Sequence, residues 1–306
     1  MREIVCPICG GHERRLLYRE TFAAEPGSSG PPRIADPEGV HYRINRCAGC
    51  GLVNSNPIFD EAGVAALYTH SPHTNVRTGE EANVRRTAEL YYRLARPYLA
   101  GKERMLDIGC DIGLLLSVAR QDGFRELHGI EPNPLAAKEA RGVAGSDITE
   151  MFYEETDFPP ARFDLVTLIH VVDHLVEVNR FLARVRRDLK VGGVVVAAVH
   201  NVRSLLARAL GERFPPYNVY HHYFFSPRTL GLLFARAGFE VLWVGSTYNC
   251  YSLGFLWDKV PRVPGVVRSA GHATLRATRL SRVPVTLPLG NIGIVARKQR
   301  ADREAL

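Results

Sequence analysis

The sequence lacks the features that mark membrane-spanning, secreted and nucleic-acid-binding chains. No run of about 18 or more apolar residues occurs, so a spanning helix is not expected. The first residues, Met-Arg-Glu-Ile-Val-Cys, contain no apolar core of a secretion signal. Aromatic and basic residues do not combine into a stripe, and no nucleic-acid partner is expected. These absences favour a cytoplasmic protein.

The composition that is present is that of a globular chain. With 306 residues, 46% of them apolar and 23% charged, the chain can form one large domain and a small one. We expect a small module over residues 1–57, a helical lead-in over 58–100 and a large domain over 101–306, in a monomer or homodimer. The net charge of +7 permits an anionic partner but does not require one, because basic residues are spread along the sequence.

Four of the six cysteines form two matched pairs. Cys6 and Cys9 make one Cys-x-x-Cys pair, Cys47 and Cys50 make the other, and a glycine follows each pair. Two such pairs can supply four thiolates to a structural zinc ion, Zn²⁺, in tetrahedral coordination. Redox exchange is the alternative function, but a redox Cys-x-x-Cys rarely occurs as a symmetric pair. The pattern also indicates a reducing compartment.

A buried strand, a glycine turn and a helix start follow one another at residues 105–119. The turn contains Gly109 and Gly113, and the pattern is that of the opening of a nucleotide-binding α/β unit. Asp107 and Asp111 would repel the pyrophosphate of a dinucleotide, which needs bare amide groups. S-adenosylmethionine instead carries a sulfonium and an ammonium group against one carboxylate. The acidic turn therefore favours S-adenosylmethionine over NAD.

Residues 106–113, Leu-Asp-Ile-Gly-Cys-Asp-Ile-Gly, resemble the first motif of class I S-adenosylmethionine-dependent methyltransferases, roughly L-D-x-G-C-G-x-G. The resemblance covers about residues 90–298. It implies a Rossmann-like α/β fold with a doubly wound, seven-stranded, mostly parallel sheet, and a zinc-ribbon-like module is a known companion of this domain. It also implies that Gly109, Cys110 and Gly113 border the cofactor. Asp111 stands where the family usually has glycine, and aspartate tolerates a left-handed backbone better than most residues.

Further cofactor contacts are expected after the following strands. Glu131 ends a predicted strand about 20 residues past the glycine turn, where an acid can accept hydrogen bonds from ribose hydroxyls. Pro132 continues this loop beside the cofactor. By the resemblance, Asp147 and Ile148 would hold the adenine, and His170 would border the cofactor at the end of another predicted strand.

Two histidine-containing segments carry the remaining chemistry. His170, Asp173 and His174 belong to a segment similar to the family's H-V-L-E-H, and in a helix they would share a face able to hold a metal ion. We expect His170 to form a pocket wall instead. His221 and His222, in a segment that resembles the family's H-x-x-x-F-S-P, are candidate general bases, because histidine titrates near neutrality. Packing is the alternative for either.

An insertion over about residues 252–290 mixes apolar residues with arginines. This basic amphipathic character predicts one of two functions. The segment either covers a lipid-like substrate and makes peripheral membrane contact, or it is a packing extension whose arginines face water.

The patterns together predict methyl transfer from S-adenosylmethionine to a small-molecule, sugar or lipid-linked acceptor. Similar two-part enzymes act in secondary-metabolite and envelope-glycan biosynthesis. One alternative is a non-catalytic zinc-ribbon binding or regulatory protein with a vestigial methyltransferase fold. In that case Asp111, in place of the family's glycine, would mark the loss of activity. The other is an NAD-linked oxidoreductase, which the acidic turn disfavours.

Overall fold

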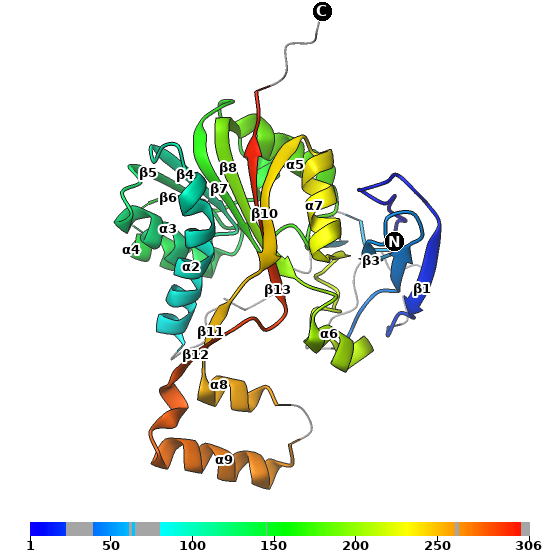
Figure 1. The fold of residues 1–306 in the computed structure, drawn as a ribbon, viewed down its shortest axis with the longest axis vertical. Helices are drawn as coiled ribbons and strands as arrows, with labels where there is room; N and C mark the ends of the chain where they lie inside the picture. Colours follow the sequence, from blue (N-terminus) through cyan, green and yellow to red (C-terminus); the bar gives the residue numbers. More distant parts are fainter. Residues whose placement is uncertain (23–38, 61–62, 65–79, 145, 261–262, 301–306) are drawn as a thin grey trace, which may run out of the picture.

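The computed structural model describes residues 1–22, 39–60, 63–64, 80–144, 146–260 and 263–300. A seven-stranded sheet in the order β10-β13-β8-β7-β4-β5-β6 forms its centre (Figure 1). Only β13 runs antiparallel to its neighbours among these strands. The α/β class and the mostly parallel sheet predicted from the sequence are confirmed. The strands are β4 (Arg104–Ile108), β5 (Glu126–Ile130), β6 (Asp147–Thr149), β7 (Phe163–Ile169), β8 (Leu189–His200), β10 (Phe239–Ser246) and β13 (Asn291–Lys298).

Helices cover both faces of this sheet, so its central strands are apolar on both sides. Along β8, Val194 and Val196 belong to the core on one face, whereas Val195 and Val199 belong to the core on the other. The first face is covered by α2 (Glu81–Ala95), α3 (Leu114–Gln121) and α4 (Pro134–Ala144), and the second by α5 (Val178–Asp188) and α7 (Pro227–Arg236) (Figure 1).

The N-terminal module forms a separate four-stranded sheet in the order β1-β2-β3-β9. Its first three strands are β1 (Arg14–Tyr18), β2 (Ile44–Cys47) and β3 (Val53–Ser55). The fourth, β9 (Tyr223–Phe224), comes from the large domain and pairs with β3. The backbone N–H of Ser55 also donates to the carbonyl of His222 at 2.9 Å. The module is therefore joined to the segment that carries the candidate bases.

The segment between β10 and β13 extends beyond the sheet (Figure 1). Strands β11 (Asn249–Ser252) and β12 (Pro284–Leu287) pair as a two-stranded stalk. The stalk carries helices α8 (Leu253–Asp258) and α9 (Gly265–Ala277) and the 3₁₀ turn η4 (Leu280–Arg282). The other short elements are α6 (Leu205–Leu210) and the 3₁₀ turns η1 (Arg96–Tyr98), η2 (Tyr153–Glu155) and η3 (Gly211–Arg213).

Several local features depart from regular strands and helices. Residues 190–193 lie inside β8 as a bulge, where the register against β7 shifts between Phe163 and Leu165. Residues 171–175 form turns rather than a helix. The sequence from Asp60 onward also predicts a short helix, and this segment falls largely outside the described residues. Within the described ranges, every helix is too short or too polar to cross a bilayer.

Candidate cofactor and acceptor site

The glycine turn lies at the carboxyl end of β4, between the ends of β5 and β7. This is the point where the strand order reverses, and open α/β sheets bind ligands there. Gly109, Asp111 and Gly113 all have left-handed φ values of 72°, 46° and 77°. A Cβ on Gly109 would lie 2.9 Å from Val171 Cγ2. Asp111 thus adopts the conformation that the family's glycine would supply.

Glu131 holds this turn in place through both of its carboxylate oxygens. Oε2 accepts the N–H of Asp111 and Oε1 accepts the N–H of Asn133, each at 2.9 Å. Burial raises the pKa of Glu131, although these two backbone donors oppose the shift. The carboxylate is fixed beside the turn, where the sequence placed an acceptor for ribose hydroxyls.

Asp107 is buried at the end of β4, with 3% of its surface exposed. Its Oδ1 accepts a hydrogen bond of 2.6 Å from the hydroxyl of Thr167. Burial raises the pKa of Asp107 to about 7, against the Thr167 hydrogen bond, and the charges of Glu131 and Asp111 raise it further. Three carboxyl groups around one turn favour a ligand with positive charge over a phosphate.

A second polar cluster surrounds Asp173 and contains four imidazoles. Asp173 is 1% exposed, and within the described part of the chain neither carboxylate oxygen has a hydrogen-bond partner. Its Oδ2 lies 3.8 Å from His221 Nε2, and its Oδ1 lies 4.0 Å from His174 Nε2. The rings of His170 and His200 lie 4.7 Å apart, and those of His200 and His221 lie 5.3 Å apart. Burial raises the pKa of Asp173 to about 7.

The tautomer of His221 follows from its hydrogen bonds. Asn218 donates from Nδ2 to the carbonyl of Pro215 and accepts at Oδ1 from the N–H of Tyr220, which fixes the orientation of the amide. The same Oδ1 lies 2.9 Å from His221 Nδ1, so Nδ1 carries the proton. Burial lowers the pKa of His221 well below its usual value. Its Nε2 is therefore an unprotonated acceptor that faces Asp173.

His200 and Asn291 belong to the same cluster, although the sequence did not single them out. Asn291 Nδ2 donates to Tyr91 and Asn249, so its Oδ1 is free to accept from His200 Nδ1 at 2.9 Å. His200 ends β8 and Asn291 begins β13, at the edge where the glycine turn lies. A polar residue after a run of buried valines was the available signal. Tyr91 also reaches this cluster through its hydroxyl.

The alternative metal set of His170, Asp173 and His174 does not converge as one group. It rested on a helix over residues 170–174, but this segment forms turns after a left-handed His170 (φ 54°). Asp173 instead lies within 4.8 Å of His170 and His200 on one side, and of His174 and His221 on the other. No helix forms here because the buried strand β7 ends directly in a tight connection.

Of the other predicted site residues, some are buried in the hydrophobic core and Pro132 lies in the loop after β5. Cys110 and Ile148 are buried in one hydrophobic cluster, and Pro132 is half-buried beside Glu131. His222 is 0% exposed, donates from Nδ1 to the carbonyl of Leu175, and packs near Tyr42 of the N-terminal module. These contacts fit a structural function for His222.

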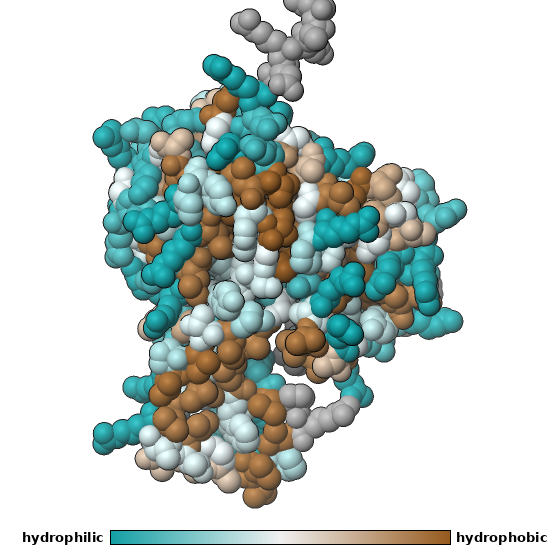
Figure 2. Space-filling view, in the orientation of Figure 1, coloured by the Kyte–Doolittle hydropathy of each residue, from teal (hydrophilic) through white to brown (hydrophobic). Residues whose placement is uncertain are grey.

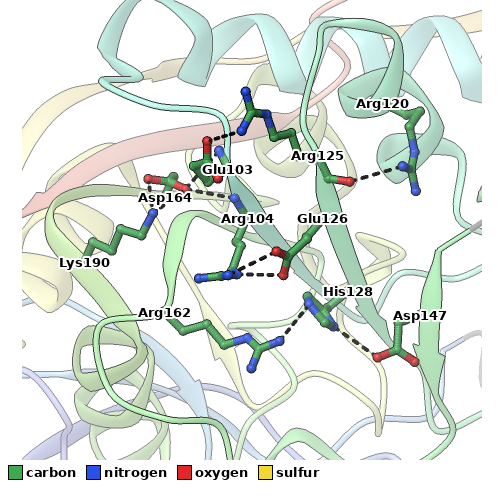
Figure 3. A network of polar contacts seen from close by, with 10 residues as sticks. All are labelled: Glu103, Arg104, Arg120, Arg125, Glu126, His128, Asp147, Arg162, Asp164 and Lys190. Atoms are coloured by element: carbon green, nitrogen blue, oxygen red, sulfur yellow. Dashed lines mark hydrogen bonds and ion pairs between the residues drawn. The ribbon is translucent and has the colours of Figure 1, made fainter.

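Asp147 lies at the amino end of β6, away from the glycine turn. Its Oδ2 is 3.3 Å from His128 Nδ1, within a polar network that joins the starts of the parallel strands (Figure 3). Arg162 extends toward His128 in the same network, and its Nη2 lies 3.2 Å from His128 Nε2. The geometry therefore does not bring Asp147 to the position expected for an adenine contact.

The four N-terminal cysteines converge as predicted. All four Sγ atoms lie within 4.8 Å of one another, with Cys6 and Cys50 at 3.5 Å and Cys9 and Cys47 at 3.4 Å. Zn–S bonds of about 2.3 Å place tetrahedral sulfurs about 3.8 Å apart, whereas a disulfide needs about 2.05 Å. The spacing fits a tetrahedral metal ion and excludes disulfides between these pairs.

The comparisons with known proteins agree with this fold and turn. Residues 80–244, more than half of the chain, match a family model described as a methyltransferase domain. The chain therefore belongs to this methyltransferase family. The large domain has the class I methyltransferase fold, and the family match gives no support to the alternative of an NAD-linked oxidoreductase.

Individual relatives share only part of the chain. A ubiquinone biosynthesis O-methyltransferase of Bradyrhizobium sp. (strain ORS 278) is 39% identical over 103 residues, and one of Rhodopseudomonas palustris (strain TIE-1) is 37% identical. Each alignment covers 32% of this chain and 40% of the relative. A solved protein from Pyrococcus horikoshii OT3 has a TM-score of 0.50 at 16% identity, over 76% of this chain and 98% of that one. This structural likeness shows the fold alone.

Proposed function

We propose that this protein transfers a methyl group to a hydroxyl or acidic carbon of a small-molecule, sugar or lipid-linked acceptor. The observation that carries the proposal is the placement of two polar clusters at one edge of the sheet. One is an acidic turn suited to a cationic cofactor, with Asp107 and Glu131. The other is an imidazole cluster with an oriented base, His221. The acceptor therefore belongs between the glycine turn and His221.

The chain's own residues have three tasks in this reaction. Glu131 and the backbone of residues 109–113 would hold S-adenosylmethionine, which would supply an electrophilic methyl group. His221 Nε2 would take the proton that the acceptor loses. Asp173 stabilises the imidazolium that results. General base catalysis of this kind contributes about 10²–10⁴-fold.

Calorimetric titration with S-adenosylhomocysteine and, separately, with NAD tests the cofactor half of this proposal. We expect micromolar binding of S-adenosylhomocysteine and none of NAD, because the acidic turn repels a pyrophosphate. Binding of neither ligand would support the vestigial, non-catalytic alternative. Binding of NAD alone would contradict the assignment of Asp107 and Glu131.

We also propose that Cys6, Cys9, Cys47 and Cys50 bind a structural Zn²⁺. Four thiolates form a closed tetrahedral set without an open coordination position, which is the donor set of structural sites. Because β9 pairs with β3 of this module, the ion would also stabilise the segment that carries His221 and His222.

Metal analysis of the purified protein should give about one zinc ion per chain, and a strong chelator should lower its melting temperature. Cys9→Ser should lose the zinc. Cys250→Ser is the control, since Cys250 lies outside the four-cysteine cluster and hydrogen-bonds toward Asn83, and it should keep the zinc. Full zinc content in Cys9→Ser would contradict the four-cysteine site.

A further inference from the structure

The hairpin formed by α8, α9 and η4 has no buried residue in these three elements, although half of their residues are apolar. Val266 on α9 is 83% exposed, and Val267, Val260 and Leu280 are each at least 40% exposed. Figure 2 shows apolar residues gathered over this hairpin, at the lower end of the view. A water-soluble extension would not normally concentrate apolar surface at its tip.

The hairpin is nonetheless internally ordered by specific contacts. Arg268 donates to the carbonyls of Trp257, Asp258 and Val260 at the end of α8, and Trp257 Nε1 donates to the carbonyl of Arg268. The indole also packs closely on Gly271, where any Cβ would lie 2.4 Å from the ring. These contacts hold the two helices together as one unit without using Val266 or Val267.

The charge of this segment differs from that of the remaining chain. Residues 249–290 contain six basic residues and one acidic residue, so they carry +5 of the total net charge of +7. The positive excess is therefore concentrated here rather than spread along the sequence. Arg276, Arg279, Arg282 and Lys259 are exposed. An anionic lipid surface matches both properties of this hairpin, because its acyl chains accept exposed aliphatic side chains and its phosphates attract arginines.

The stalk of the hairpin starts at the proposed acceptor site. Asn249, the first residue of β11, accepts a hydrogen bond from the Tyr91 hydroxyl at 3.0 Å and another from Asn291, the partner of His200. Asn249 and the cluster lie at the carboxyl edge of the sheet, and the hairpin extends from that edge (Figure 1). A surface that binds the hairpin would thus lie on the same side of the molecule as the site.

We propose that the α8–α9 hairpin docks this protein on the surface of an anionic phospholipid bilayer, with Val266 and Val267 inserted among the headgroups and Arg276, Arg279 and Arg282 against lipid phosphates. This docking is independent of the methyl-transfer assignment. If both hold, the site faces the membrane, and the acceptor belongs to the class of lipid-linked or membrane-dissolved molecules.

Flotation of the full chain with vesicles tests the proposal. We expect the protein to float with vesicles of phosphatidylcholine containing about 30% phosphatidylglycerol, and much less with phosphatidylcholine alone. Raising the salt should weaken binding, since exposed charges are screened within about 10 Å at 0.1 M. Replacing Arg276, Arg279 and Arg282 by Glu should weaken binding on the order of a hundredfold, and the pair Val266→Asp and Val267→Asp should abolish it.

The matched control reverses the same number of charges on other faces. Lys138, Arg180 and Arg228 are exposed on α4, α5 and α7, and their replacement by Glu should leave flotation with anionic vesicles largely intact. S-adenosylhomocysteine binding by all variants reports the fold and the cofactor site separately. Failure of the wild type to float, or an equal loss in the control, overturns the proposal. A dimer that the valine substitutions dissociate, without vesicle binding, would assign this surface to a second copy of the chain.

Discussion

Affinity for S-adenosylmethionine should rise with pH up to about pH 7 and then become constant. Burial raises the pKa of Asp107 to about 7, so the carboxyl group is largely neutral below that pH in the free protein. A cationic ligand binds more tightly when Asp107 is ionised than when it is neutral, so binding should release the proton of Asp107. Below about pH 7 the dissociation constant should therefore increase up to tenfold for each unit of pH lost. Calorimetry in buffers of different ionisation enthalpy measures the released proton directly.

The variant Asp107→Asn separates the effect of ionisation at Asp107 from a loss of folding. Asparagine keeps an oxygen that can accept from Thr167, but it cannot ionise, so affinity should fall by about tenfold to a hundredfold at pH 8 and lose its pH dependence. The free variant should nonetheless be more stable than the wild type at pH 8. A carboxyl group whose folded pKa is raised loses stability as pH rises from about 4 to about 7, and asparagine avoids that loss.

S-adenosylhomocysteine, which lacks the sulfonium charge, is the ligand control and should show a much smaller pH dependence. An equal dependence for both ligands would place the sulfonium away from Asp107. A variant that binds S-adenosylmethionine as well as the wild type at pH 8 would remove Asp107 from the cofactor site.

The cofactor end of the site was predictable because its residues are close in sequence. Gly109, Asp111 and Glu131 belong to one β–loop–α–β unit, and the hydrogen bond from Asp111 N–H to Glu131 spans only 20 residues. The parallel sheet was predictable for a related reason, since strands buried on both faces produce continuous apolar runs. The error at Asp147 came from β6, whose three residues give too short a pattern to show which end faces the cofactor.

The acceptor end depends on contacts that local patterns do not encode. His200, Asn218 and Asn291 come from separate segments, and their meeting depends on β13 inserting antiparallel between β8 and β10. The pairing of β9 with β3 joins residues about 170 positions apart and moves His222 into the junction with the N-terminal module. Sequence alone suggested two equivalent histidines. Only the long-range pairing distinguishes His221 from His222.

Replacing His221 by Asn should lower turnover by about 10²–10⁴-fold, whereas the same replacement at His222 should change it little. In both variants the amide nitrogen of Asn can reproduce the donor at Nδ1, and in both the Nε2 atom is lost. At His222 the preserved bond is the one to the carbonyl of Leu175, and at His221 it is the one to Asn218. If cofactor affinity is unchanged in both variants, a loss of turnover in His221→Asn alone shows that Nε2 acts in catalysis at position 221 and not at position 222. Equal losses in the two variants would assign both histidines to packing.

Asn218 should act as a positioning residue for His221, because its amide sets which ring nitrogen carries the proton. Asn218→Asp keeps an oxygen to accept from Nδ1 and should retain most activity, whereas Asn218→Leu should lower turnover about tenfold or more. The nitrogen chemical shifts of the His221 ring supply a readout that simple loss of packing would not move. In the wild type and in Asn218→Asp they should report a proton on Nδ1, and in Asn218→Leu a mixture of tautomers. An unchanged tautomer in Asn218→Leu would show that another contact orients the base, and the drop in turnover would then have to arise from packing around Asp173.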